Sequence, residues 1–183
     1  MLKRIGAEES GEFKAVASGT LPSGKPVVVN ADGTVSVVEE STSYSVVTTK
    51  AEYSANNVNG QVSVYDTNSD RVVIVFRDSD TSNHGIAIVG TITAASITFG
   101  AAVVFENSHS NLFGITFDST NNKIVMSYRD EGDSGKGKAV VGTVDPSDNS
   151  ISFGTPATFN SGSTFNTSAA FDTNTGKSVI VYR

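Results

Sequence analysis

One pattern returns three times along the chain and restricts it to a repetitive β architecture. An aromatic-Asp pair is followed each time by an aromatic-Arg pair: Tyr65-Asp66 and Phe76-Arg77, Phe117-Asp118 and Tyr128-Arg129, Phe171-Asp172 and Tyr182-Arg183. Asp and Arg are 11 positions apart in every copy, and successive copies are 52 and 54 residues apart. A period of about 50 residues made of short strands is typical of propeller or solenoid proteins.

Each of the first two copies contains four strand-like pieces rich in Val, Ile and Thr, separated by turn residues, and the third contains the first three. The third piece, residues 124–129 in the second copy, is largely apolar on both faces, which indicates a central strand covered on both sides. Four strands make one propeller blade, and a blade must stack on others to bury its faces. The sequence therefore predicts an all-β fold with propeller-like blades at residues 45–98, 99–152 and, in part, 153–183.

The third copy is shorter than the other two. The first two continue past their Arg into Asp78 and Asp130 and then into a fourth strand-like piece, whereas the third stops at Arg183. A propeller closes with about four to eight blades. We therefore expect the natural chain to extend beyond Arg183, with blades pooled from several subunits as the alternative.

The N-terminal region has a different pattern. Within residues 19–38, two Val-rich runs flank the turn Asn30-Ala31-Asp32-Gly33. Asp and Gly tolerate the left-handed backbone that a tight hairpin turn needs. We therefore predict a short β-hairpin, and we assign residues 1–44 to a segment distinct from the blades at 45–183.

Composition argues against several function classes. The net charge is −6 and the sequence pI is near 4.8. Because the chain is acidic and has no basic stripe, it is a poor candidate for nucleic-acid binding. The chain has no Cys, which excludes disulfides and thiolate metal sites, and no apolar run approaches membrane-spanning length. We expect no cofactor, no metal, no nucleic-acid partner and no membrane insertion.

Residues 132–138 (GDSGKGK) partly match a phosphate-binding loop and the nucleophile segment of serine proteases. The run lacks the phosphate-loop spacing and the Ser or Thr after Lys, and it leads into a strand rather than a helix. A serine nucleophile would need a histidine, and His84 and His109 both lie in polar loop contexts. We interpret the run as a glycine-rich hairpin loop and expect a protein that is not an enzyme.

The turn at residues 172–176 (DTNTG) spaces its oxygen-bearing side chains as a calcium loop does, and residues 66–70 half resemble it. A calcium ion needs six to eight oxygen ligands, including a bidentate carboxylate, and neither turn has the distal Glu. We therefore favour Asx turns, in which the Asp side chain accepts hydrogen bonds from its own backbone.

The aromatic-Arg-Asp runs are the most regular polar feature. Aromatic rings stack on sugars and Arg binds carboxylates through its fork, so a repeated row of these residues is a candidate glycan site. The alternative, which repetition in every copy favours, is that each Arg ends a buried strand and bridges adjacent blades. The candidate ligand-binding residues are Phe76, Arg77, Asp78, Tyr128, Arg129 and Asp130.

Residues 17–35 (ASGTLPSGKPVVVNADGTV) resemble a leader of virion and tail-fibre proteins of tailed phages, in which such a hairpin precedes long repeat arrays. The blade-like units that follow, with their Tyr-Asp and Tyr-Arg-Asp spacing, are similar to those arrays. The resemblance covers nearly the whole chain but supplies no catalytic residues.

The resemblance implies a phage virion structural protein, a tail fibre or tail-associated adhesin, that attaches by its N-terminus and presents β repeats to the host. Its expected partners are other virion proteins and a host surface glycan or protein, with a homo-oligomer, a trimer foremost, as the assembly. It would be assembled in the host cytoplasm and reside in the virion. The alternatives are a capsid decoration or head-fibre protein and a sugar-binding propeller lectin, while a sialidase-like propeller enzyme ranks below them.

Overall fold

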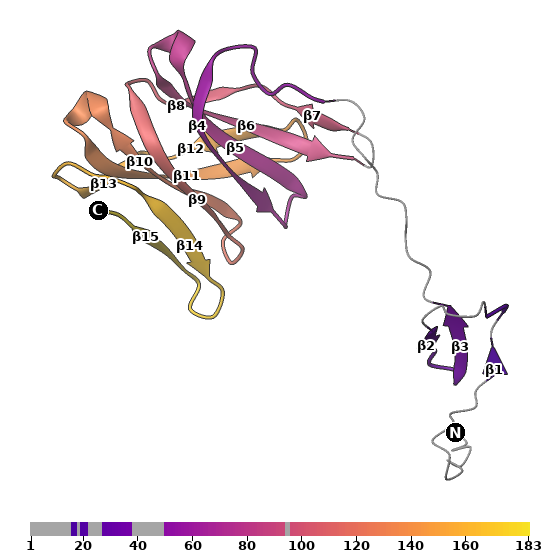
Figure 1. The fold of residues 1–183 in the computed structure, drawn as a ribbon. Coiled ribbons are helices and arrows are strands. Elements are labelled where there is room, and N and C mark those ends of the chain that lie inside the picture. Colours follow the sequence, from indigo (N-terminus) through magenta and orange to yellow (C-terminus); the bar gives the residue numbers. More distant parts are fainter. Residues whose placement is uncertain (1–15, 18, 22–26, 38–49, 94–95) are drawn as a thin grey trace. The chain divides into compact units, whose positions relative to one another are not determined.

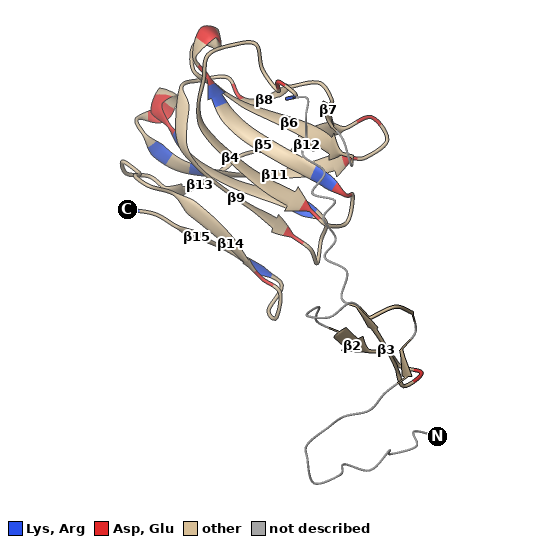
Figure 2. Ribbon diagram, turned by 45° about the vertical axis from the view of Figure 1, so that its right-hand side comes forward, with Lys and Arg blue, Asp and Glu red and all other residues tan. Residues whose placement is uncertain are grey.

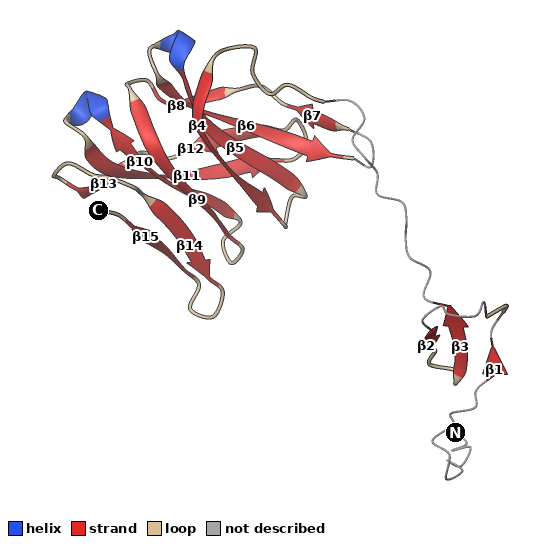
Figure 3. Ribbon diagram, viewed as in Figure 1, coloured by secondary structure: helices blue, strands red, loops and turns tan. Residues whose placement is uncertain are grey.

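A computed structural model describes residues 16–17, 19–21, 27–37, 50–93 and 96–183. The chain divides into two compact units, Met1–Tyr44 and Ser45–Arg183. The described residues of both units are built of strands with only two short 3₁₀ turns, so the all-β prediction is confirmed (Figure 3). Among these residues there is no helix of the length and apolarity that crossing a membrane requires.

The first unit contains the predicted hairpin. Strands β2 (Val27–Val29) and β3 (Thr34–Val37) pair antiparallel, and β1 (Val16–Ala17) adds to β3 in parallel. The turn closes because Asp32 accepts a hydrogen bond from the Thr34 backbone at 2.9 Å while Gly33 adopts a φ of +82°. The rest of the predicted docking segment, residues 1–15, 18, 22–26 and 38–44, lies outside the described residues.

The second unit contains three antiparallel sheets in chain order (Figure 1). The first sheet is ordered β4 (Val58–Asp66), β5 (Arg71–Asp78), β6 (His84–Ile92) and β7 (Ile97–Phe99), with β8 (Val103–Glu106) also on β6. The second repeats this with β9 (Ser110–Asp118), β10 (Lys123–Asp130), β11 (Lys136–Asp145), β12 (Ser150–Phe153) and β13 (Ala157–Asn160). The third holds β14 (Ser168–Asp172) and β15 (Lys177–Val181).

The outer position of each complete sheet is shared by two short strands. Strand β7 pairs with residues 90–92 of β6, and β8 pairs with residues 85–87 of the same strand. Strands β12 and β13 divide β11 in the same way. The piece that opens the second or the third sequence copy therefore completes the sheet of the copy before it, and the hydrogen-bonded sheets are offset from the sequence units.

Glycines on β6 and β11 explain the spacing of the phenylalanines on these outer strands. A Cβ on Gly85 would lie 2.5 Å from the Phe105 ring, and one on Gly137 would lie 2.4 Å from the Phe159 ring. Gly90 and Gly142 stand in the same relation to Phe99 and Phe153, respectively. Each ring lies on the bare backbone of the facing strand, so glycine is the one residue that fits beneath it.

The sheets stack face to face around a shared apolar core. Val73 and Val75 of β5 belong to the same buried cluster as Met126 and Tyr128 of β10. The opposite face of β10 turns toward the third sheet, since a Cβ on Gly114 would meet both the Ser127 hydroxyl and the Ser168 backbone. The prediction that residues 124–129 form a central strand, covered on both faces, is confirmed.

The outer face of the first sheet has a small core of its own. Phe76, Ile86 and Ile88 are buried there, with Tyr53 and Phe99 packed against them. Tyr53 holds the repeat position of Phe105, and its ring meets Phe76 edge-on at 5.1 Å. Tyr53, which precedes β4, thus helps to cover the face of the first sheet that corresponds to the face covered by a neighbouring sheet in the other two.

Candidate ligand pocket at the first strands

The first strands of the three sheets lie side by side, with β4 and β14 both packed against β9 (Figure 1). A left-handed residue occupies the same repeat position in all three: Gly60 of β4 at φ +66°, Leu112 of β9 at +53°, and Asn166 just before β14 at +51°. In the two complete sheets, the pairing of the first strand with the second shifts register beside this residue, which marks a β-bulge.

Leu112 is the strained member of this set. Gly and Asn adopt left-handed backbone readily, whereas a bulky side chain there is an outlier. Backbone strain of this kind clusters at binding and catalytic sites. The surface that these three residues share is therefore a candidate binding site.

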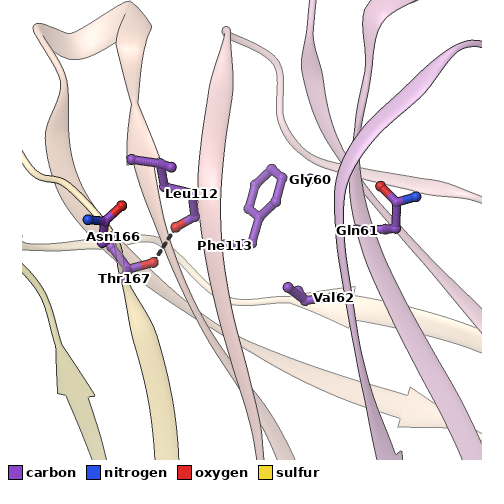
Figure 4. A pocket seen from close by; sticks show the side chains of 7 residues that line it. All are labelled: Gly60, Gln61, Val62, Leu112, Phe113, Asn166 and Thr167. Carbon is purple, nitrogen blue, oxygen red and sulfur yellow. Dashed lines mark hydrogen bonds between the residues drawn. The ribbon is translucent and has the colours of Figure 1, made fainter.

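That surface is an open pocket of about 410 Å³, a size that suits a small ligand. It is lined by Gly60, Gln61, Val62, Leu112, Phe113, Asn166 and Thr167 (Figure 4). The hydroxyl of Thr167 donates to the carbonyl oxygen of Leu112 and ties the start of the third sheet to the bulge of the second. Phe113 lies near Gly60, whose position would bring a Cβ within 3.8 Å of the Phe113 ring.

The lining residues provide binding chemistry rather than proton transfer. Their polar side chains are the exposed carboxamides of Gln61 and Asn166 and the hydroxyl of Thr167, which already donates a hydrogen bond to Leu112. A carboxamide offers two donors and one acceptor oxygen. Gln61 and Asn166 can therefore form hydrogen bonds with an uncharged polar ligand, while Leu112 and Val62 offer apolar contact.

The residues predicted to bind ligand lie elsewhere, and their burial favours the structural interpretation. Phe76 and Tyr128 are 1% and 0% exposed, so neither ring is free to stack on a sugar. Asp78 and Asp130 cap the 3₁₀ turns Ser79–Thr81 and Glu131–Asp133, where each accepts hydrogen bonds from backbone N–H groups. The structure places all four in the cores and turns of the sheets.

The two arginines of this set join one sheet to the loop that leads to the next. Arg129 donates from Nη1 to the Ser163 hydroxyl at 2.9 Å and to the Thr164 carbonyl at 2.7 Å. In the preceding copy, Nη1 of Arg77 lies 3.3 Å from Nε2 of His109, which holds the repeat position of Ser163. These contacts agree with the structural interpretation of the repeated arginines, in which each Arg bridges adjacent sheets.

Asp130 is the most constrained carboxylate of the second sheet. Burial opposes its ionisation, but hydrogen bonds from Lys138 at 2.5 Å and from the Ser108 hydroxyl at 2.6 Å outweigh that effect. The pKa of Asp130 is consequently held below its ordinary value. Next to it, burial and the nearby Glu106 carboxylate raise the pKa of Tyr128, whose hydroxyl donates to Glu106 at 3.0 Å.

The acidic turns are Asx turns, as predicted. Asp66, Asp118 and Asp172 each accept from the backbone N–H two residues later, at 2.9–3.0 Å. In the part of the chain that the structure describes, no group of three or more His, Asp or Glu side chains is placed to hold a metal ion.

The run at residues 132–138 is the predicted hairpin loop. Glu131–Asp133 forms one 3₁₀ turn, Ser134 and Gly135 adopt left-handed backbone, and β11 begins at Lys136. Both histidines hold framework positions, His84 at the start of β6 and His109 beside Arg77.

Charged side chains lie mostly at strand ends and in turns, while the sheet faces are largely uncharged (Figure 2). The pocket belongs to this uncharged region, so the acids, bases and repeated charges of the sequence give no sign of it. One signal was present in the sequence: Gly60 and Asn166, both tolerant of left-handed backbone, occupy the same repeat position. No protein-family model, curated protein or solved structure matches this chain.

Proposed function

We propose that this chain is a structural protein of a tailed-phage virion, a tail fibre or tail-associated adhesin. Its N-terminal unit attaches to other virion proteins, and its stacked sheets are presented to the host surface. The support is the division into two units: a small hairpin unit, whose sequence resembles a leader of virion proteins, and a separate repeat unit.

Binding by this adhesin rests on the pocket at the first strands, which is the observation that carries the proposal. Three repeat-related residues with left-handed backbone meet at one concave surface with two exposed carboxamides and no titratable side chain among its lining residues. Such a surface suits an uncharged polar ligand, and we propose the hydroxyl and amide groups of a host glycan. Several copies on one particle would raise a weak contact by roughly 10²–10⁴.

Immunogold electron microscopy of the parent phage tests the placement. Antibodies raised against residues 45–183 are expected to label the tail. Label on the head would overturn the tail assignment in favour of a capsid decoration protein, and particles without label would overturn virion placement altogether.

Binding to a panel of immobilised bacterial surface glycans tests the pocket. Gln61→Ala and Asn166→Ala should each weaken retention by about five- to tenfold, the effect of one lost hydrogen bond. Asn174→Ala is the matched control, because this exposed Asn lies in the β14–β15 turn away from the pocket. Equal loss in the control, or no loss in either pocket variant, would separate the pocket from binding.

A further inference from the structure

The two complete sheets differ in the charges around the arginine at the end of their second strand. Arg129 of β10 donates from Nε to the Glu131 carboxylate at 2.7 Å. The first sheet has Ser79, which carries no charge, at the repeat position of Glu131. Among the described residues no carboxylate forms an ion pair with Arg77, and the Nε of Arg77 is buried without a hydrogen-bond partner. Arg77 therefore lacks the carboxylate that Arg129 has.

An asparagine lies directly across from Arg77. Asn59 of β4 is opposite Arg77 of β5 in the antiparallel register, so the two side chains project from the same face of the sheet. Nδ2 of Asn59 donates to the Ser79 hydroxyl at 3.0 Å, whereas the matching Asn111 donates to the Glu131 carboxylate at 3.1 Å. Asn59 thus faces the location where the second sheet holds its carboxylate.

The following residue distinguishes the two asparagines. Asn59 is followed by Gly60, and Asn111 is followed by Leu112. In an Asn-Gly pair, no side chain on the second residue hinders the approach of its amide nitrogen to the Asn carboxamide. A Cβ placed on Gly60 would have only the Phe113 ring within 4 Å, at 3.8 Å, so the space around this pair is open.

The β-bulge removes this pair from regular strand pairing. The register of β4 on β5 breaks after Asn59 and resumes at Val62, so Gly60 has no paired residue on β5. Asn59 and Gly60 are exposed to water, whereas Asn111 is half-buried. The first sheet thus combines an accessible carboxamide, an unhindered amide nitrogen and a nearby cation without a carboxylate.

We propose that Asn59 is a site of spontaneous deamidation, and that the Asp formed there gives Arg77 the carboxylate partner that Arg129 has in Glu131. The modification needs no enzyme, because Gly60 supplies the attacking nitrogen and the solvent supplies water. It adds one negative charge to the net charge of −6.

The reaction has two steps. The amide nitrogen of Gly60 loses its proton to water and bonds to Cγ of Asn59, the Cγ–Nδ2 bond breaks, and ammonia leaves a cyclic imide. Water then adds to one carbonyl of the ring and breaks the bond from that carbon to the ring nitrogen. Opening at the former Cγ gives Asp, and opening at the main-chain carbonyl gives an isoaspartyl linkage with one more methylene in the backbone.

Tandem mass spectrometry of the full chain, sampled during incubation in mildly alkaline buffer, tests the site. Deamidation at Asn59 should be at least about tenfold faster than at Asn111, which holds the same repeat position. Gly60→Asn is the matched variant, because Asn tolerates left-handed backbone but places a side chain beside the attacking nitrogen. It should slow the reaction at Asn59 by about tenfold, with circular dichroism to check the fold.

Urea denaturation tests the role of Arg77. Asn59→Asp copies one product and should raise the folding equilibrium constant by about threefold, as expected of a partly exposed ion pair. The gain should disappear when Asn59→Asp is combined with Arg77→Gln. It should also shrink in about 1 M salt, which screens the ion pair without a second substitution.

Two outcomes would overturn the proposal. Deamidation at Asn59 that is no faster than at Asn111, or that is unchanged in Gly60→Asn, would exclude the modification site. A gain from Asn59→Asp that persists both in Arg77→Gln and in high salt, or no gain at all, would exclude Arg77 as the partner of the new carboxylate.

Discussion

Arg129 donates a hydrogen bond to the carbonyl oxygen of Thr164 at 2.7 Å, which ties the second sheet to the loop that opens the third. The same guanidinium lies 4.6 Å from the centre of the Phe165 ring and donates to Glu131 at 2.7 Å. One side chain thus contacts a carboxylate of the 3₁₀ turn Glu131–Asp133 together with a carbonyl and an aromatic ring of the loop before β14.

Replacing Arg129 should therefore loosen the third sheet more than it affects the second. We expect Arg129→Ala to lower the free energy of unfolding by about 2–3 kcal/mol, through lost charged hydrogen bonds and cation-π contact. Hydrogen exchange should accelerate chiefly in residues 163–172. Lys123→Ala, which removes one exposed bond to Thr143, is the control and should cost less than about 0.5 kcal/mol. Uniform acceleration across both sheets would contradict the bridging role.

Asp130 gives a pH prediction. Its folded-state pKa lies below the ordinary value of about 3.9. The stabilisation is accordingly present above pH 4 and is lost as pH falls through the folded pKa. We expect the urea midpoint of the wild type to drop between pH 5 and pH 3, and Asp130→Asn to flatten part of that drop. Unchanged pH dependence in the variant would show that other carboxylates account for the acid sensitivity.

At neutral pH, Asp130→Ala should be costly because Lys138 and Ser108 lose a buried acceptor. The expected loss is about 2–3 kcal/mol in the free energy of unfolding. Asp133→Ala, which removes a more exposed partner of Lys136, should cost less than about 1 kcal/mol. Chemical denaturation of both variants makes the comparison, and equal losses would count against the capping role of Asp130.

The glycine-phenylalanine pairs predict strong sensitivity to one methyl group. Gly137→Ala should destabilise the second sheet by about 1–3 kcal/mol, because the new Cβ would overlap the Phe159 ring. Gly154→Ala is the matched control, with its nearest neighbour 3.8 Å from the added Cβ, and it should be close to neutral. Thermal unfolding distinguishes them. Relief of Gly137→Ala by Phe159→Ala would identify the ring as the cause.

The first-strand bulge predicts an order among substitutions at Gly60. Gly60→Val should cost about 1–2 kcal/mol because its φ of +66° disfavours a branched side chain. Gly60→Asn should cost less, since Asn166 already adopts this backbone at the same repeat position. Denaturant titration ranks the two variants, and equal stability would mean that the bulge relaxes when it is substituted.

The repeat spacing predicted the sheets because each repeated residue type has a local cause. The Asp of each aromatic-Asp pair ends a strand and forms an Asx turn, and the glycine-rich run at 132–138 closes a hairpin. These features depend on neighbours a few residues away, so a sequence pattern is enough to locate them. The hairpin at 27–37 was predictable for the same reason.

The features that sequence reasoning missed depend on tertiary partners. Phe105 was recognised by its spacing, but its contact with Gly85 of the preceding sequence copy is fixed only when β8 adds to β6. Leu112 gives no sign of left-handed backbone, because Leu is a poor former of that conformation. The pocket remained hidden since none of its residues titrates.

The divided outer strand has a consequence for how such arrays grow. Strands β8 and β13 each pair with the sheet of the preceding sequence copy. If a whole sequence period were duplicated or deleted, each remaining strand of this kind would therefore still find a matching strand to pair with. A single period excised on its own would contain the outer strand that pairs with the preceding sheet and would lack the outer strand of its own sheet. A change of length by whole periods thus leaves the strand pairing intact, and the smallest piece with a complete sheet spans the junction between two periods.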